Sequence, residues 1–98
     1  MARRRSPEPE QQLDLHGMPV EQALRHLERA LLSLRVGGVR DVRLILGRGI
    51  GSPDGRPRLA PAVEQWLRGA DGARLGVTIT GRAGKGGALD VRLGPPRQ

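Results

Sequence analysis

A short alternating stretch that runs into an amphipathic helix constrains the fold more than any other part of this sequence. The stretch is Leu13-Asp14-Leu15-His16-Gly17, and Pro19 follows two residues later. Successive side chains of a strand point to opposite faces, so the two leucines share one face while Asp14 and His16 share the other. Proline suits the first turn of a helix, where its missing N–H is not needed. The sequence therefore predicts a strand-to-helix corner that carries a carboxylate beside an imidazole.

The segment from Pro19 to Val36 has the apolar spacing of an amphipathic helix. Its apolar side chains recur every three or four residues, at Val20, Ala23, Leu24, Leu27, Ala30, Leu31 and Leu34. Gly37-Gly38 supplies the stop signal. A helix of this length can join two parallel strands as a right-handed crossover. We therefore expect its apolar stripe to form a main wall of the core.

The remaining pattern predicts a small α/β domain. We expect strands at Gln12–Leu15, Asp41–Leu46, Leu75–Thr80 and Ala88–Leu93, and a second helix at Leu59–Arg68. The element order is then β-α-β-α-β-β. Both helices should cover one face of a four-stranded sheet, because the last two strands alternate as strands covered on one side do. Trp66 should lie in the core.

The 98 residues suffice for one domain. Residues 1–12 are polar, charged and rich in proline, so we expect a disordered basic arm, then a domain over residues 13–93 and a disordered tail over 94–98. The chain has no cysteine, which excludes disulfides and thiolate metal sites. No apolar run reaches the length of a membrane span or a signal-peptide core. We therefore expect a cytoplasmic monomer without membrane contact.

The charge of the chain favours an anionic partner. The net charge is +7, and from residue 13 onward 14 basic residues stand against 8 acidic ones. Such an excess on a small domain points first to nucleic acid, with solubility as the alternative explanation. Trp66 is the only aromatic residue. Sheets and channels that stack several bases need several exposed rings, so we expect contacts mainly to phosphate.

Two glycine-containing corners should meet in one cleft, because ligands collect at the carboxyl ends of parallel strands. One corner follows the first strand and carries Asp14 and His16. The other follows the second strand, where glycine N–H groups and arginines suit phosphate oxygens. Its candidate phosphate-binding residues are Gly47, Arg48, Gly49, Gly51, Ser52, Arg56 and Arg58. The segment is neither a P-loop nor a dinucleotide fingerprint, and a flexible turn is the alternative.

The Asp14–His16 pair has plainer interpretations too. A histidine before a helix is often a polar capping group, and Asp14 could be an ordinary surface acid. His26 is expected on the solvated face of the first helix.

Several motifs in a fixed order resemble one family. They are Leu-Asp-Leu-His-Gly, Gly-Arg-Gly-Ile-Gly-Ser after a strand, a Leu-x-x-x-Val-x-x-Trp-Leu helix, and a final Gly-Gly-Ala-Leu-Asp-Val-Arg-Leu. Together they resemble the Smr (small MutS-related) domain over Leu13 to Leu93. The stretch Ser-Pro-Asp-Gly-Arg-Pro-Arg-Leu resembles the stand-alone bacterial members. The resemblance implies a two-layer α/β fold with a mixed four-stranded sheet, nucleic-acid binding and, in many members, endonuclease activity on RNA or DNA.

The family pattern also implies roles for individual residues. Asp14 and His16 fall on its catalytic pair, residues 47–49 on its Gly-x-Gly loop that meets the phosphates, and Gly87-Ala88 on its terminal Gly-Ala. The chain departs from the pattern at three positions. Leu46 replaces a frequent His or Thr, Gly51 replaces a His, and Lys85 replaces a usual glycine. Within the last glycine-rich loop, the candidate nucleic-acid-binding residues are Arg82, Lys85, Gly86 and Gly87.

The first hypothesis is an endonuclease acting on RNA or structured DNA, in which His16 is the general base or acid and Asp14 orients it. It needs no cofactor, although a divalent ion would help if the substrate is DNA. The second hypothesis is a non-catalytic module that binds nucleic acid or the ribosome. The third is a protein–protein adaptor that uses the uncovered sheet face.

Overall fold

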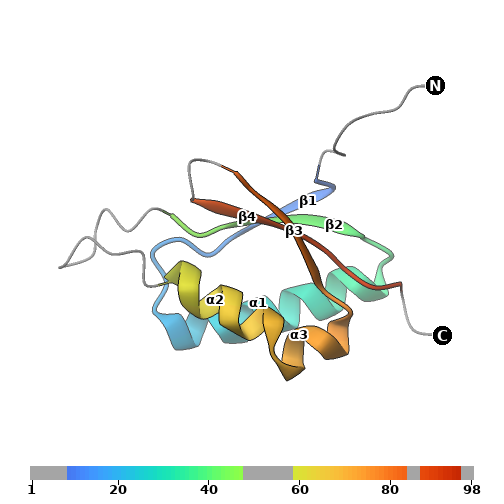
Figure 1. Ribbon diagram of the computed structural model, residues 1–98, viewed down its shortest axis with the longest axis horizontal. Helices are drawn as coiled ribbons and strands as arrows, with labels where there is room; N and C mark the ends of the chain where they lie inside the picture. Colours follow the sequence, from blue (N-terminus) through green and yellow to red (C-terminus); the bar gives the residue numbers. More distant parts are fainter. Residues whose placement is uncertain (1–8, 48–58, 84–86, 96–98) are drawn as a thin grey trace.

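A computed structural model describes residues 9–47, 59–83 and 87–95 of the chain. These residues form, in order, β1 (Gln11–Asp14), α1 (Val20–Val36), β2 (Asp41–Ile45), α2 (Leu59–Arg68), α3 (Ala70–Leu75), β3 (Thr78–Ala83) and β4 (Ala88–Arg92). The helices lie along one face of the sheet, and no described element covers the other, which we call the uncovered face (Figure 1).

The sheet has the strand order β1-β2-β4-β3. β1 and β2 are parallel, and the other two neighbouring pairs are antiparallel. The two-layer α/β fold with a mixed four-stranded sheet is therefore confirmed, with α1 as the crossover of the parallel pair. At one end of the sheet, Asp14 pairs with Ile45, and Ile45 pairs with Ala88. We call this row of residues the site edge.

The prediction of two helices is wrong, because a third helix, α3, follows α2 after Gly69. The predicted strand Leu75–Thr80 begins too early, because Leu75 is the last residue of α3 and lies buried in the core. A Cβ on Gly72 would lie 1.8 Å from the carbonyl oxygen of Leu67, so this glycine lets α3 pack against the end of α2. Six residues are fewer than two helical turns, which is too short for a helical period to show in sequence.

The other element boundaries lie close to those expected. β3 begins at Thr78 rather than Leu75, because Gly76 ends α3 in the left-handed conformation with φ 67°. β1 begins at Gln11, inside the segment expected as an arm. Just before it, a carboxylate oxygen of Glu10 accepts hydrogen bonds from the N–H groups of Arg40 (2.7 Å) and Asp41 (3.0 Å). These bonds lower the pKa of Glu10 and hold the start of β1 beside the start of β2.

The core lies between the sheet and the helices. The stripe predicted for α1 is present, with Ala23, Leu27 and Leu31 buried and Leu24 half-buried. Side chains of the sheet, and of the residues directly after β1 and β4, meet this stripe from the other side. The fully buried ones are Leu15, Val42, Leu44, Leu89, Val91 and Leu93. Trp66 packs half-buried against the same cluster. The core thus separates the helix layer from the uncovered sheet face.

Within the described parts of the chain, no helix combines enough length and apolar character to cross a bilayer.

Candidate functional site

Asp14 and His16 form a close pair at the end of β1. The backbone of Leu15 still pairs with β2, through its N–H to the Ile45 carbonyl at 2.8 Å, and its side chain is fully buried. Oδ1 of Asp14 accepts the backbone N–H of His16 at 3.1 Å and lies 2.5 Å from its Nδ1. One carboxylate oxygen therefore positions both the backbone and the ring of His16. The two side chains are 60% and 65% exposed, so the pair is open to a ligand.

The hydrogen bonds determine what His16 can do chemically. The side-chain bond from His16, followed by its backbone bond, lowers the pKa of Asp14 below the ordinary value of 3.8. An ionised carboxylate only accepts hydrogen bonds, so Nδ1 of His16 carries the proton in this contact. In the neutral ring, Nε2 then keeps its lone pair and can act as a base. The capping interpretation fails, because α1 begins after Pro19 without any side-chain cap.

The second corner lies against the first at Gly47. A Cβ placed on Gly47 would lie 3.3 Å from the Cβ of His16, and Gly47 has a positive φ of 79°. The N–H groups of Leu46 and Gly47 both donate to the carbonyl of Gly87, at 2.8 and 3.0 Å. Segments after β1, after β2 and before β4 therefore converge at the site edge.

Gly47 and Leu46 differ from what the sequence and the family pattern predict for this corner. Glycine N–H groups were expected to point toward a ligand, but the N–H of Gly47 is used inside the protein by Gly87. Its contribution is the absence of a side chain beside His16. Leu46, where the family pattern often has a polar residue, is buried in the core.

Most of the other candidate residues lie outside the described part of the chain. These are Arg48, Gly49, Gly51, Ser52, Arg56, Arg58, Lys85 and Gly86.

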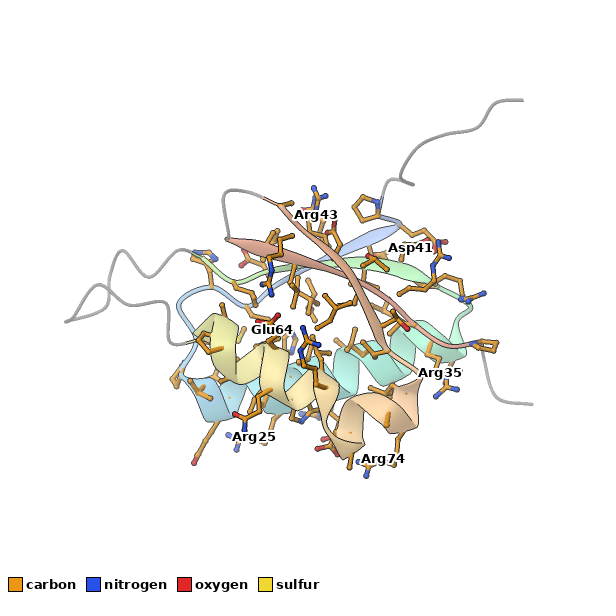
Figure 2. The ribbon with its side chains drawn as sticks, in the orientation of Figure 1. Arg25, Arg35, Asp41, Arg43, Glu64 and Arg74 are labelled. Carbon is orange, nitrogen blue, oxygen red and sulfur yellow. The ribbon has the colours of Figure 1, made fainter. Side chains whose placement is uncertain are left out.

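Arg82 is described, and the structure does not bring it to the Asp14–His16 pair. The pairing of β3 with β4 shifts register between Ile79 and Gly81, which places Arg82 opposite Leu89. Leu89 is buried toward the helices, and paired residues share a face, so Arg82 faces the helix layer. There its guanidinium pairs with Glu64 of α2, which lies between α2 and the sheet in Figure 2. Asp14 lies on the opposite sheet face at the far edge strand.

Glu64 holds two guanidinium groups. It binds Arg82 and also accepts a hydrogen bond from Arg68 at 3.2 Å. The bond from Arg82 is the main cause that lowers the pKa of Glu64. The ion pair with Arg82 therefore connects α2 to β3, while the pair with Arg68 lies within α2.

The uncovered sheet face carries charged pairs that the sequence analysis did not single out. Arg43 binds Asp90 across β2 and β4, and Arg92 binds Asp41 in the same way. The charged residues are two positions apart in each strand, and this alternation in the sequence could have indicated that they share one sheet face. A hollow of about 240 Å³ lies on this face, lined among others by the two pairs, Pro9 and Thr80. Figure 2 shows Arg43 pointing away from the helix layer.

Metal ligands are not gathered in the described ranges. Across residues 9–47, 59–83 and 87–95, no group of three or more His, Cys, Asp or Glu side chains is arranged to hold an ion.

Comparisons with known proteins agree with this fold. The family model of the Smr domain matches residues 13–94. The Smr domain of Thermus thermophilus MutS2 has 29% identity and a TM-score of 0.68, covering 87% of this chain and 99% of that one. The Smr domain of NEDD4-binding protein 2 has 31% identity and a TM-score of 0.65, covering 99% and 100%. The human small-MutS related domain has 34% identity and a TM-score of 0.56, covering 84% and 99%. No curated protein sequence matches the chain.

Proposed function

The chain belongs to the Smr domain family, whose members are nucleic-acid-binding and nuclease-related domains, and from this premise we propose that it is an endonuclease that cleaves RNA. The observation that carries the proposal is the contact of 2.5 Å between Nδ1 of His16 and Oδ1 of Asp14. It leaves Nε2 of an exposed imidazole as a base with a defined direction. The basic excess of the chain supports an anionic substrate.

RNA suits a site of this kind because it carries its own nucleophile. Nε2 of His16 takes the proton of a 2′-hydroxyl, and the 2′ oxygen forms a bond to the adjacent phosphorus. The bond from phosphorus to the 5′ oxygen breaks, and the leaving oxygen takes a proton from water. The products are a 2′,3′-cyclic phosphate and a 5′-hydroxyl. Asp14 holds the tautomer of His16 and stabilises the imidazolium that forms.

The phosphate needs donors for its developing charge. We assign this part to Arg48 and to N–H groups of the segment that follows Gly47, because Gly47 itself lies beside His16. Gly47 itself supplies space, since its own N–H is bound to Gly87.

The test is a cleavage assay on structured RNA and on supercoiled DNA, with and without a chelator. We expect RNA to be cut in the presence of chelator and to end in a cyclic phosphate. His16→Ala should abolish cutting while retaining RNA binding, and Asp14→Asn should slow it by orders of magnitude. His26→Ala is the matched control, because His26 is the other histidine and is exposed on α1. Cleavage that stops in chelator and leaves a 5′-phosphate would instead indicate a metal-assisted nuclease able to nick DNA.

One observation favours a second function, a non-catalytic nucleic-acid-binding or ribosome-binding module. Leu46 is apolar and buried directly after β2, so this position offers no polar group to the Asp14–His16 pair. RNA binding by the folded protein without any cleavage would support the module.

A further inference from the structure

The hollow on the uncovered face lies on the same side of the sheet as Asp14. Val42 and Leu44 of β2 are buried under the helices, so the alternate residues of β2 face the uncovered side. Asp14 pairs with one of these, Ile45, and Arg43 lies two residues back along the same strand. Two strand residues span about 7 Å. A nucleotide next to one held at the site edge could therefore reach the hollow.

The hollow presents two guanidinium groups held in fixed planes. Nε and Nη2 of Arg43 bind the two carboxylate oxygens of Asp90 at 2.7 and 3.0 Å. Nε and Nη2 of Arg92 bind those of Asp41 at 3.0 and 3.4 Å. Such two-point contacts lie in the plane of the guanidinium and orient it. An oriented guanidinium can stack its flat face on a ring.

The charge of the hollow does not suit a phosphate. The formal charges of its two guanidinium groups and two carboxylates cancel, and the hydrogen bond to Asp41 raises the pKa of Arg92. The carboxylates of Asp41 and Asp90 are 19% and 26% exposed and would repel an anion. A neutral flat group with polar edges fits these surroundings better. The volume lies below the range of about 300–1,000 Å³ typical of pockets for larger ligands.

A nucleobase has this chemistry. Unpaired bases of RNA stack on guanidinium planes as well as on aromatic rings, and their edges bind carboxylates and hydroxyls. The only aromatic residue, Trp66, packs against the core on the helix side. On the uncovered face the flat groups are therefore the guanidinium groups, and Thr80 adds a hydroxyl beside them.

We propose that this hollow is a base-binding subsite, in which one unpaired nucleobase of the strand bound at the Asp14–His16 corner stacks on the guanidinium planes of Arg43 and Arg92. The part of this proposal that concerns a nucleic-acid strand bound at the Asp14–His16 corner rests on the proposed function, whereas binding of a free base by the hollow does not. The subsite would give the domain a preference for single-stranded or bulged nucleic acid.

The first experiment titrates the full chain with neutral nucleosides and follows backbone amide signals by NMR. We expect shifts at Thr80, Asp90 and Arg92 that are larger than those at Gly17. Arg92→Lys keeps the charge and loses the flat plane, so it should weaken the response several-fold. Arg25→Lys on the exposed side of α1 is the matched control. Absence of shifts, or equal shifts with ribose alone, would overturn the subsite.

The second experiment measures binding of short single-stranded RNAs that each carry one abasic position. Loss of the base at one position should lower affinity about tenfold, the size of one stacking contact, and Arg92→Lys should remove that difference. The subsite is overturned if no abasic position changes the RNA affinity and nucleosides cause no shifts in the amide signals. The proposed function would not be affected by that result. Nucleoside shifts in a protein that neither binds nor cuts RNA support the subsite and overturn the proposed function.

Discussion

At the scale of single residues, the site depends on one oxygen atom and one missing side chain. Oδ1 of Asp14 holds both the N–H and the ring of His16, which fixes the ring where a free side chain would sample several rotamers. Gly47 leaves the space beside that ring. The Asp14–His16 pair is therefore oriented by these two features while both side chains stay exposed to solvent.

Gly47 provides a prediction with a close control. Gly47→Ala should destabilise the protein by about 1–3 kcal/mol, since a Cβ is strained at positive φ, and it should also impair cleavage because that Cβ meets His16. Gly38→Ala carries the same kind of strain, at φ 89°, but its Cβ meets nothing within 4 Å. Denaturant unfolding should show similar losses of stability in the two variants. The kcat/KM of cleavage should fall only in Gly47→Ala. Equal kinetics in the two variants would remove the packing argument.

At the scale of elements, α1 forms one wall of the core and carries the chain between β1 and β2, so their carboxyl ends meet at one edge. Its buried stripe and its exposed side are clearly separated, with Leu27 buried and Leu32 52% exposed. α2 is joined to β3 by a different interaction, the ion pair of Glu64 with Arg82, while Arg68 binds Glu64 from within α2. The helix layer is therefore held to the sheet by apolar packing and by the ion pair between Glu64 and Arg82.

The stripe of α1 can be tested with two leucines of the same helix. Leu27→Ala should lower the free energy of unfolding by about 2–5 kcal/mol, because it leaves a cavity in the core. Leu32→Ala removes the same atoms from an exposed position and should change stability by less than about 0.5 kcal/mol. Chemical denaturation measures both, and equal losses would contradict the assignment of the buried face.

The two ion pairs of Glu64 predict a pH dependence. The bonds of Arg82 and Arg68 lower the pKa of Glu64 below its ordinary 4.5, so the folded state holds this carboxyl ionised more readily than the unfolded chain does. The stabilisation is therefore present above pH 4.5 and is lost as the pH falls through the lowered pKa. Glu64→Gln should melt at a lower temperature than the unmodified protein near neutral pH, and the difference should shrink in acid. A difference that stays constant down to strongly acidic pH would assign the effect to packing.

At the scale of the whole molecule, the domain has two unlike surfaces. One end of the sheet gathers the Asp14–His16 corner, and the uncovered face carries charge pairs that cancel. The net charge of +7 is thus not concentrated on the described sheet face. We therefore expect the long-range attraction of a nucleic-acid strand to come from the charge of the whole chain rather than from this face.

The overall charge predicts binding dominated by phosphate contacts. The logarithm of the binding constant should fall linearly with the logarithm of salt concentration, by about 0.7–0.9 for each phosphate neutralised. Arg48→Ala and Lys85→Ala should each weaken binding to all sequences alike and reduce the slope. Fluorescence anisotropy across a salt series measures this. An affinity that is insensitive to salt would contradict the prediction.

Local pattern in the sequence was enough for the elements that repeat a period. The spacing of leucines in α1 and the alternation in β1 predicted which faces are buried and that Asp14 and His16 lie together, because these periods depend only on neighbouring residues. The meeting of the corners after β1 and β2 followed from a topological rule, that the carboxyl ends of parallel strands lie at the same edge of a sheet. Tertiary structure alone decided α3, which is too short for a period, and the register shift that turns Arg82 toward Glu64. It also decided the partner of the Gly47 N–H and the pairing of Arg43 with Asp90, 47 residues apart. Register and long-range pairing follow from how whole strands fit together, and no local period encodes them.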